Sequence, residues 1–134
     1  MAINFYEFPD NRSGAAFIPI SQNEVPVASV TAFVMQGQVV GLYATIGWQG
    51  TGSVSPIMVR YRLWRGAPLT GTSVSSAIDS AEPGFDNFVT TNFAHIDTGF
   101  TSNQNATYVL TAQLLNPGTA AAVIGGLVLT VQPI

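Results

Sequence analysis

The sequence predicts an all-β fold, and two observations carry this prediction. From Val25 onward, runs rich in β-branched and aromatic residues alternate with short segments of Gly, Pro, Asn and Ser, which is typical of strands joined by turns. No segment repeats apolar residues at the i, i+3, i+4 and i+7 spacing of an amphipathic helix. Seven to eight short strands at such intervals favour an antiparallel β-sandwich, most simply a jelly roll.

Turn residues bound the predicted strands. Met35-Gln36-Gly37 separates the first two strands, and Gly66-Ala67-Pro68 ends the third. Asn116-Pro117-Gly118 precedes the last strand, which is apolar on both faces and contains Gly125-Gly126. Such a strand is expected at the centre of a sheet or beneath a neighbouring subunit. The predicted strands cover residues 27–34, 38–48, 57–65, 72–78, 85–96, 106–115 and 121–131.

Residues 1–20 differ from the rest, and we expect them to form an N-terminal arm ahead of a sandwich domain at residues 21–134. The arm follows neither a period of two nor one of 3.6. Phe5, Tyr6 and Phe8 make it too apolar for a disordered tail, since such tails are poor in aromatic residues. The arm is therefore expected to dock on its own subunit, a neighbour or a larger scaffold, for example by adding a short strand to an open sheet edge.

Charge is scarce in this chain. Only 8% of its 134 residues are charged, it contains no Lys and no Cys, and its net charge is −3. This composition argues against nucleic-acid binding, which needs a broad basic face, and it leaves no thiol chemistry. Soluble domains usually carry about a quarter charged residues, which keep copies apart in solution. The scarcity of charge therefore favours a protein that assembles with copies of itself.

Three of the four Arg residues fall within residues 59–65, on one predicted strand. Because side chains alternate along a strand, Arg60 and Arg62 share a face with Trp64. One interpretation is a ligand or partner patch, since Arg and Trp are enriched at binding hot spots. The other is that the two arginines pair with acidic neighbours on the outer face, and in an oligomer both can hold. The residues of this candidate patch are Arg60, Arg62, Trp64 and Trp48.

His95 and Asp97 are the only His and carboxylate close together in the sequence. No nucleophile motif accompanies them, so we interpret Asp97 as an acceptor of backbone N–H groups in a turn. An acidic loop contains Asp79, Glu82 and Asp86, but their spacing matches no calcium-binding loop. The sequence therefore predicts no catalytic residue, no metal site and no cofactor.

Four segments carry a resemblance to a known group of proteins: residues 41–48, 59–65, 92–98 and 105–112. Through them the chain resembles the small β-sandwich proteins of endospore surfaces in bacilli and their relatives. More distantly, it is similar to the tumour-necrosis-factor-like heads of collagen-like exosporium glycoproteins, and phage-fibre heads share the same pattern. The resemblance implies a trimeric or fibrous surface protein, made without Sec export. A collagen-like region and arm cysteines are missing, so its assembly would be non-covalent.

Two hypotheses about function follow. The first is a structural protein of a spore or particle surface that forms a homo-oligomer, by resemblance a trimer, and attaches to a larger scaffold. The second is a carbohydrate- or receptor-binding head, with Trp48, Trp64 and Tyr61 as candidate platforms. No apolar run reaches the roughly 20 residues of a membrane span, and residues 1–10 lack the basic region of a secretory signal. We therefore expect no membrane span. Because no nucleophile motif accompanies His95 and Asp97, we also expect that the protein is not an enzyme.

Overall fold

The structure of the protein, a computed structural model, describes residues 4–8, 18–52, 56–82 and 87–134. Every regular element in these ranges is a strand, which confirms the predicted all-β fold. The strands are β1 (Asn4–Phe8), β2 (Ile18–Ile20), β3 (Val25–Val34), β4 (Val40–Gly52), β5 (Ile57–Arg65), β6 (Thr72–Ala81), β7 (Phe88–Asp97), β8 (Gln104–Leu114) and β9 (Thr119–Pro133).

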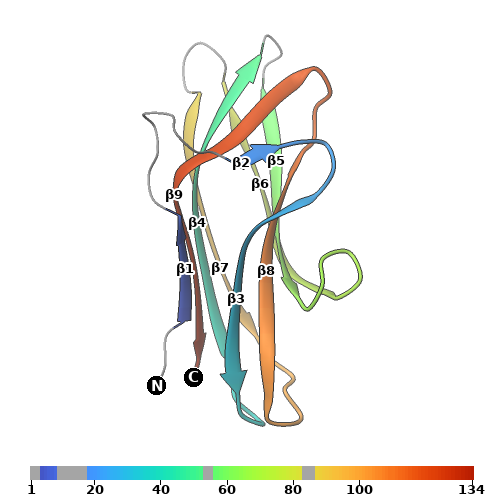
Figure 1. Ribbon diagram of the computed structural model, residues 1–134, viewed down its shortest axis with the longest axis vertical. Coiled ribbons are helices and arrows are strands. Elements are labelled where there is room, and N and C mark those ends of the chain that lie inside the picture. The colour runs from blue at the N-terminus through green and yellow to red at the C-terminus, as the bar shows by residue number, and fades with distance from the viewer. Residues whose placement is uncertain (1–3, 9–17, 53–55, 83–86) are drawn as a thin grey trace.

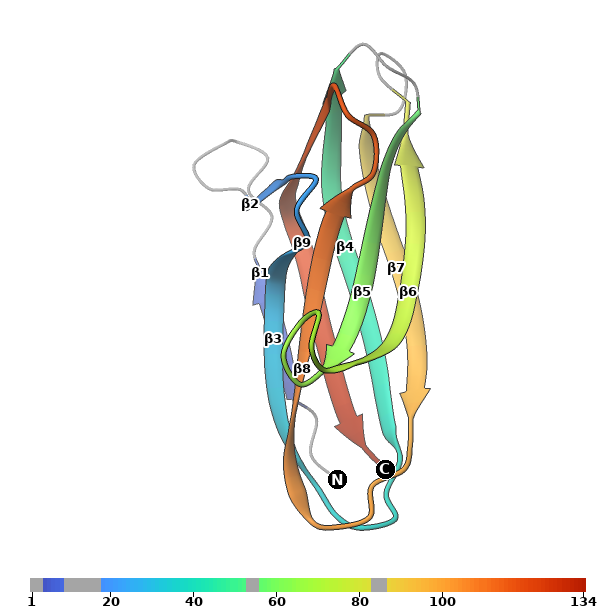
Figure 2. The ribbon, with the colours of Figure 1, turned by 90° about the vertical axis from the view of Figure 1, so that its right-hand side faces the viewer.

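The strands form two antiparallel sheets that pack face to face (Figures 1 and 2). Sheet A has the order β1-β9-β4-β7, with β2 also paired to β9, and sheet B has the order β3-β8-β5-β6. The pairs β5–β6, β4–β7, β3–β8 and β2–β9 are nested one inside the other along the chain. An antiparallel ribbon rolled up into two such sheets is a jelly roll. The structure therefore confirms the predicted type of sandwich.

The long strands β3–β9 match the predicted strands, with differences at some ends. β6 continues to Ala81, so Asp79 belongs to a strand and not to the predicted acidic loop. It does so because Asp79 pairs with Val59 in sheet B, and its carboxylate accepts a hydrogen bond from Thr91 of sheet A. β7 begins at Phe88, and residues 85–86 of the predicted strand lie outside the described residues.

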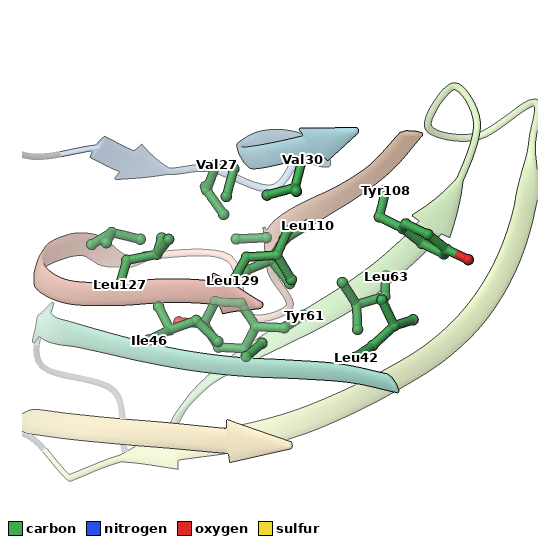
Figure 3. Packing of buried hydrophobic residues seen from close by; sticks show 14 of the residues in the cluster. Val27, Val30, Leu42, Ile46, Tyr61, Leu63, Tyr108, Leu110, Leu127 and Leu129 are labelled. Carbon is green, nitrogen blue, oxygen red and sulfur yellow. The ribbon is translucent and has the colours of Figure 1, made fainter. Parts of the chain in front are cut away.

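The core fills the space between the sheets. Along β4 and β9 the buried side chains recur at every second position, as the period of two predicts. Figure 3 shows side chains of both sheets meeting there, among them Leu42 and Ile46 of sheet A and Tyr61 and Leu63 of sheet B. Burial of one such side chain is worth about 1.5–3 kcal/mol, so this layer supplies most of the stability.

β9 lies inside sheet A, as its apolar character predicted, and glycines allow it to approach β4 closely. The register between β4 and β9 shifts on both sides of Gly47. A Cβ atom on Gly47 would lie 2.1 Å from the carbonyl oxygen of Gly125, which is far inside van der Waals contact. The next residue, Gly126, has a φ of 64°, in the left-handed region. Glycine is therefore required at this crossing of the two strands.

The described parts of the N-terminal arm belong to sheet A. Residues 4–8 pair with residues 131–127, and residues 18–20 pair with residues 123–121. Because β4 pairs with β9 along its other side, β1 and β2 share one edge of β9. These parts of the arm thus add strands to an open edge of their own subunit, which is one of the expected forms of docking. Residues 9–17 lie outside the described residues.

Candidate assembly surface

Arg60, Arg62 and Trp64 lie on β5, on the outer face of sheet B, as alternation predicts. The residues between them are fully buried in the core. On the neighbouring strand β8, Gln113 lies opposite Arg60, and Thr111 lies opposite Arg62. The candidate patch therefore spans two adjacent strands.

Glu24, in the segment between β2 and β3, is the centre of this patch. Its carboxylate accepts hydrogen bonds from Arg62 through Nε (2.9 Å) and Nη2, from Trp64 Nε1 (2.8 Å) and from Thr111 Oγ1 (3.0 Å). The Glu24 side chain is only 4% exposed. Burial by itself would raise the pKa of Glu24, but the hydrogen bonds outweigh it and lower the pKa below its ordinary value of 4.5. Glu24 is thus charged at neutral pH and bound within its own chain.

The two arginines also make their contacts within the chain. Arg60 Nη2 donates to Gln113 Oε1, and Gln113 Nε2 donates to the backbone carbonyl of Gln22 at 2.9 Å. The guanidinium carbon of Arg62 lies 5.0 Å from the centre of the Trp64 ring, within the range of a cation–π contact. Arg62 therefore pairs with an acidic neighbour, Glu24, on the outer face, as one interpretation predicted. Arg60 also bonds on the outer face, but its partner is the neutral Gln113 and not a carboxylate.

The prediction that Trp48 belongs to this patch is wrong. Trp48 lies on β4 of sheet A and is fully buried, because it shares the inward-facing positions of that strand. Its indole N–H donates to Thr91 Oγ1 at 2.8 Å, and the Thr91 hydroxyl donates to Asp79 Oδ2 at 2.7 Å. Tyr61, which is also fully buried, meets Trp48 edge to face with ring centres 6.3 Å apart. Both aromatic residues are core residues and cannot serve as ligand platforms.

Asp97 anchors the end of β7. Its carboxylate accepts the backbone N–H of Thr98 at 3.0 Å, as the turn interpretation predicted, and the hydroxyl of Tyr108 at 2.7 Å. Arg65 Nε lies 3.4 Å from the same carboxylate. Burial, together with the Asp97 hydrogen bond and charge, raises the pKa of Tyr108 well above its ordinary value of 10. Asp97 thus ties β7 to β5 and β8, while His95 is half-buried on the same strand.

The structure describes two of the three residues of the predicted acidic loop, Asp79 and Glu82. Asp79 is engaged with Thr91, Glu82 is exposed just after β6, and Asp86 lies outside the described residues. Within the described ranges, no group of His, Asp and Glu side chains is placed to hold a metal ion. The same ranges contain no helix with the length and apolar character needed to span a bilayer.

Sequence reasoning missed a second surface, the outer face of β9, β4 and β7, which we call the uncharged face. Tyr43, Phe88 and Ile96 stand on it, exposed to 47%, 50% and 56%. A shallow depression of about 500 Å³ lies beside Tyr43 and Ile96. The signal was present in the sequence, because residues 38–52, 88–96 and 119–133 contain no Lys, Arg, Asp or Glu.

Hydrogen bonds between side chains hold the uncharged face together. Asn92 Oδ1 of β7 accepts the Thr45 hydroxyl of β4 at 2.8 Å and the Tyr43 hydroxyl at 3.4 Å. These contacts link the exposed side chains of β4 to β7 across the outer face of sheet A.

The comparisons with known proteins concern the fold alone. No family model and no curated protein sequence matches the chain. Among solved structures, it is similar to the functional form of the mosquito-larvicidal Cry4Aa toxin from Bacillus thuringiensis, with 16% identity over 88% of this chain and 19% of that chain, and a TM-score of 0.45. It is also similar to the VP2 subviral particle of infectious bursal disease virus (13% identity, 96% of this chain, 36% of that chain, TM-score 0.44) and to the Gx strain of that virus (12%, 98%, 36%, 0.47). The chain thus spans 19% of the toxin chain and 36% of each of the two viral chains.

Proposed function

We propose that this chain is a structural protein that assembles with copies of itself, and that the uncharged face is its main contact surface. The observation that carries the proposal is the exposure of Tyr43, Phe88 and Ile96 on a sheet face whose strands β9, β4 and β7 present no charged side chain outward. The proposal gives the chain no enzymatic activity and no cofactor.

The chemistry of this face suits burial against a second protein surface. The centres of protein interfaces are depleted of charge and enriched in aromatic residues. No ion would have to be stripped of water when the face is covered, so the usual cost of burying charge is absent. Covering the exposed apolar area is worth about 25 cal/mol per Å². Adjacent copies can therefore associate here without a specific network of ion pairs.

The alternative hypothesis is a carbohydrate- or receptor-binding head, but the aromatic residues that would form its ligand platform are not available. Trp48 and Tyr61 are in the core, and the indole N–H of Trp64 is bound to Glu24. The arginines beside Trp64 are also paired within the chain. For this reason we do not propose a ligand site at the arginine patch.

The resemblance to endospore-surface proteins supports a more specific form of the proposal. In that form the chain is a subunit of a surface layer or fibre on a spore or similar particle, held by non-covalent contacts, with a trimer as the basic unit. The absence of cysteine is consistent with such contacts.

The experiment is to measure molar mass against concentration for the wild type, Tyr43→Lys and Ser29→Lys. Ser29 is exposed on the outer strand β3 of sheet B, so it controls for adding one positive charge elsewhere. We expect the wild type to exceed its 14.1 kDa monomer mass, the Tyr43 variant to return toward it, and the Ser29 variant to behave as the wild type. A wild type that stays monomeric at every concentration tested would refute the proposal.

A further inference from the structure

β7 ends sheet A on one side, and in the described part of the chain no strand pairs with its outer edge. The backbone N–H of Gly50 donates to the carbonyl of Asn87 at 2.9 Å, in continuation of the β4–β7 register. Bonded and non-bonded pairs alternate in an antiparallel ladder. The odd-numbered residues of β7 therefore bond to β4, and the even-numbered ones direct their N–H and C=O groups away from the sheet.

In the described residues, β7 lacks two of the features that block pairing with another chain at a sheet edge, proline and an irregular register. β2 contains Pro19, and β3 contains Pro26 with a register shift between Pro26 and Ala28. Proline and such irregularities are known protections of sheet edges, as are lysines. β7 is ten residues long and contains no Pro. The even-numbered residues from Phe88 to Ile96 are all exposed.

We infer that two copies of this chain join edge to edge through β7, antiparallel, with the two-fold axis at Asn92. Along the free edge the residues read apolar, small, polar, small, apolar. A two-fold axis at the middle residue places Phe88 opposite Ile96 of the second copy and Thr90 opposite Ala94. Residues with free backbone groups then meet only residues with free backbone groups, so every pair exchanges hydrogen bonds. The edge is self-complementary in the way that a two-fold contact requires.

The core-facing side chains of β7 also favour a second copy of the chain at this edge. Val89 and Phe93 pack against the core but are only partly buried, because sheet A ends beside them. A β7 strand from a second copy would extend the sheet over this side of the sandwich. Asp79, across the gap on β6, is held by the Thr91 hydroxyl. The Asp79 carboxylate therefore already has a hydrogen-bond partner in its own chain, and the contact with a second copy does not have to supply one. In Figure 2, β6 and β7 run along the same side of the molecule.

This inference rests on the proposed self-assembly and names the edge that carries one of its contacts. The first test is Thr90→Pro, with Thr90→Val as the matched control. Proline at residue 90 removes an N–H that faces away from β4, so the β4–β7 ladder keeps its bonds. We expect Thr90→Pro to weaken the two-fold contact at least about tenfold, because each copy loses a backbone hydrogen bond and gains a ring at the joint. Thr90→Val should assemble as the wild type, and circular dichroism should show that both variants are folded.

The second test determines the register and does not depend on proline. The chain has no cysteine, so a single one can be introduced. In the inferred pairing, residue 92 faces its own copy at a Cα separation of about 5.5 Å, whereas the two residues 90 lie about 13 Å apart along the strands. A short thiol-specific cross-linker should therefore give covalent dimers with Asn92→Cys and few with Thr90→Cys. Equal cross-linking of the two variants would overturn the register.

The outcomes separate this inference from the proposed function. If the wild type is monomeric, both fail. If the wild type assembles, Tyr43→Lys weakens it, and Thr90→Pro assembles unchanged, then self-assembly stands and the β7 contact is refuted. Loss of assembly in Thr90→Pro, together with cross-linking at residue 92, supports the edge contact.

Discussion

The carboxylate of Glu24 accepts the indole N–H of Trp64 at 2.8 Å, although 40 residues separate them in the chain. The same carboxylate binds Arg62 and Thr111, so one side chain holds strands β5 and β8 together with the segment that enters β3. For the arginine patch, the sequence left open a partner site or a set of pairs on the outer face. The structure shows Arg62 and Trp64 bonded to Glu24 of their own chain. We call these contacts of Glu24 the clasp.

Replacing Glu24 with Gln should destabilise the protein by about 2 kcal/mol, because charge-assisted hydrogen bonds become neutral ones and Arg62 loses its counter-ion. Urea unfolding at neutral pH measures the change. Ser29→Ala, at an exposed position of the outer strand β3, is the control and should change the free energy of unfolding by less than about 0.5 kcal/mol. Equal effects of the two substitutions would show that the clasp contributes nothing specific.

Acid should weaken the wild type partly through Glu24. A carboxyl group whose pKa is lowered on folding stabilises the folded state above its unfolded pKa, and this contribution is lost as the pH falls through the folded pKa. The Glu24 contribution should therefore disappear below its ordinary pKa of 4.5. Unfolding free energies measured in steps from about pH 6 to about pH 3 should fall more steeply for the wild type than for Glu24→Gln. Parallel curves would contradict the lowered pKa.

Two buried tyrosines should respond differently to substitution by Phe. Tyr108→Phe should cost about 1–2 kcal/mol, because it removes the donor that bonds to buried Asp97 at 2.7 Å. For the hydroxyl of Tyr61, no described residue supplies a hydrogen bond. Tyr61→Phe should therefore be neutral or stabilising. Thermal and urea unfolding of both variants check the prediction, and a larger loss at residue 61 than at residue 108 would contradict it.

Gly47→Ala should cost about 3 kcal/mol or more, since the new methyl group would sit 2.1 Å from the Gly125 carbonyl oxygen and force β4 and β9 apart. Gly41→Ala on the same strand is the control, because its nearest atom would be Ile134 Cδ1 at an ordinary 3.5 Å. Denaturant unfolding compares the two. If both alanine variants are equally stable, the two strands are not fixed as closely as described.

Deletion of residues 1–16 should leave a folded sandwich of lower stability. Almost all of the core comes from β3–β9, but the loss of β1 uncovers the edge of β9 at residues 127–131. Without β1, this part of β9 becomes an unpaired sheet edge, and such an edge is a template for irregular association. We expect a lower melting temperature, and aggregates in place of defined oligomers, by calorimetry and light scattering. Unchanged stability and mass would show that the arm is dispensable.

Much of the fold could be predicted because strand formation depends on local alternation. The period of two along β4 places Leu42, Ile46 and Trp48 on one face, and that face is buried. The same rule gave the outward positions of Arg60 and Arg62. The prediction was weakest for the arm, since residues 4–8 carry no alternation strong enough to mark a strand and depend on the register offered by β9.

The sequence by itself determined the fold class, the strands β3–β9 and the face that each of them buries, because these follow from side-chain alternation and turn residues within short segments. Only the tertiary structure decided which faces and partners come together. It sent Trp48 to the core and Trp64 to the outer face of the other sheet, and it brought Glu24 to Arg62. It also gathered three strands without outward charge into one surface. These outcomes depend on the order of strands in the two sheets, which is fixed by long-range pairing and leaves no mark in any single segment of the chain.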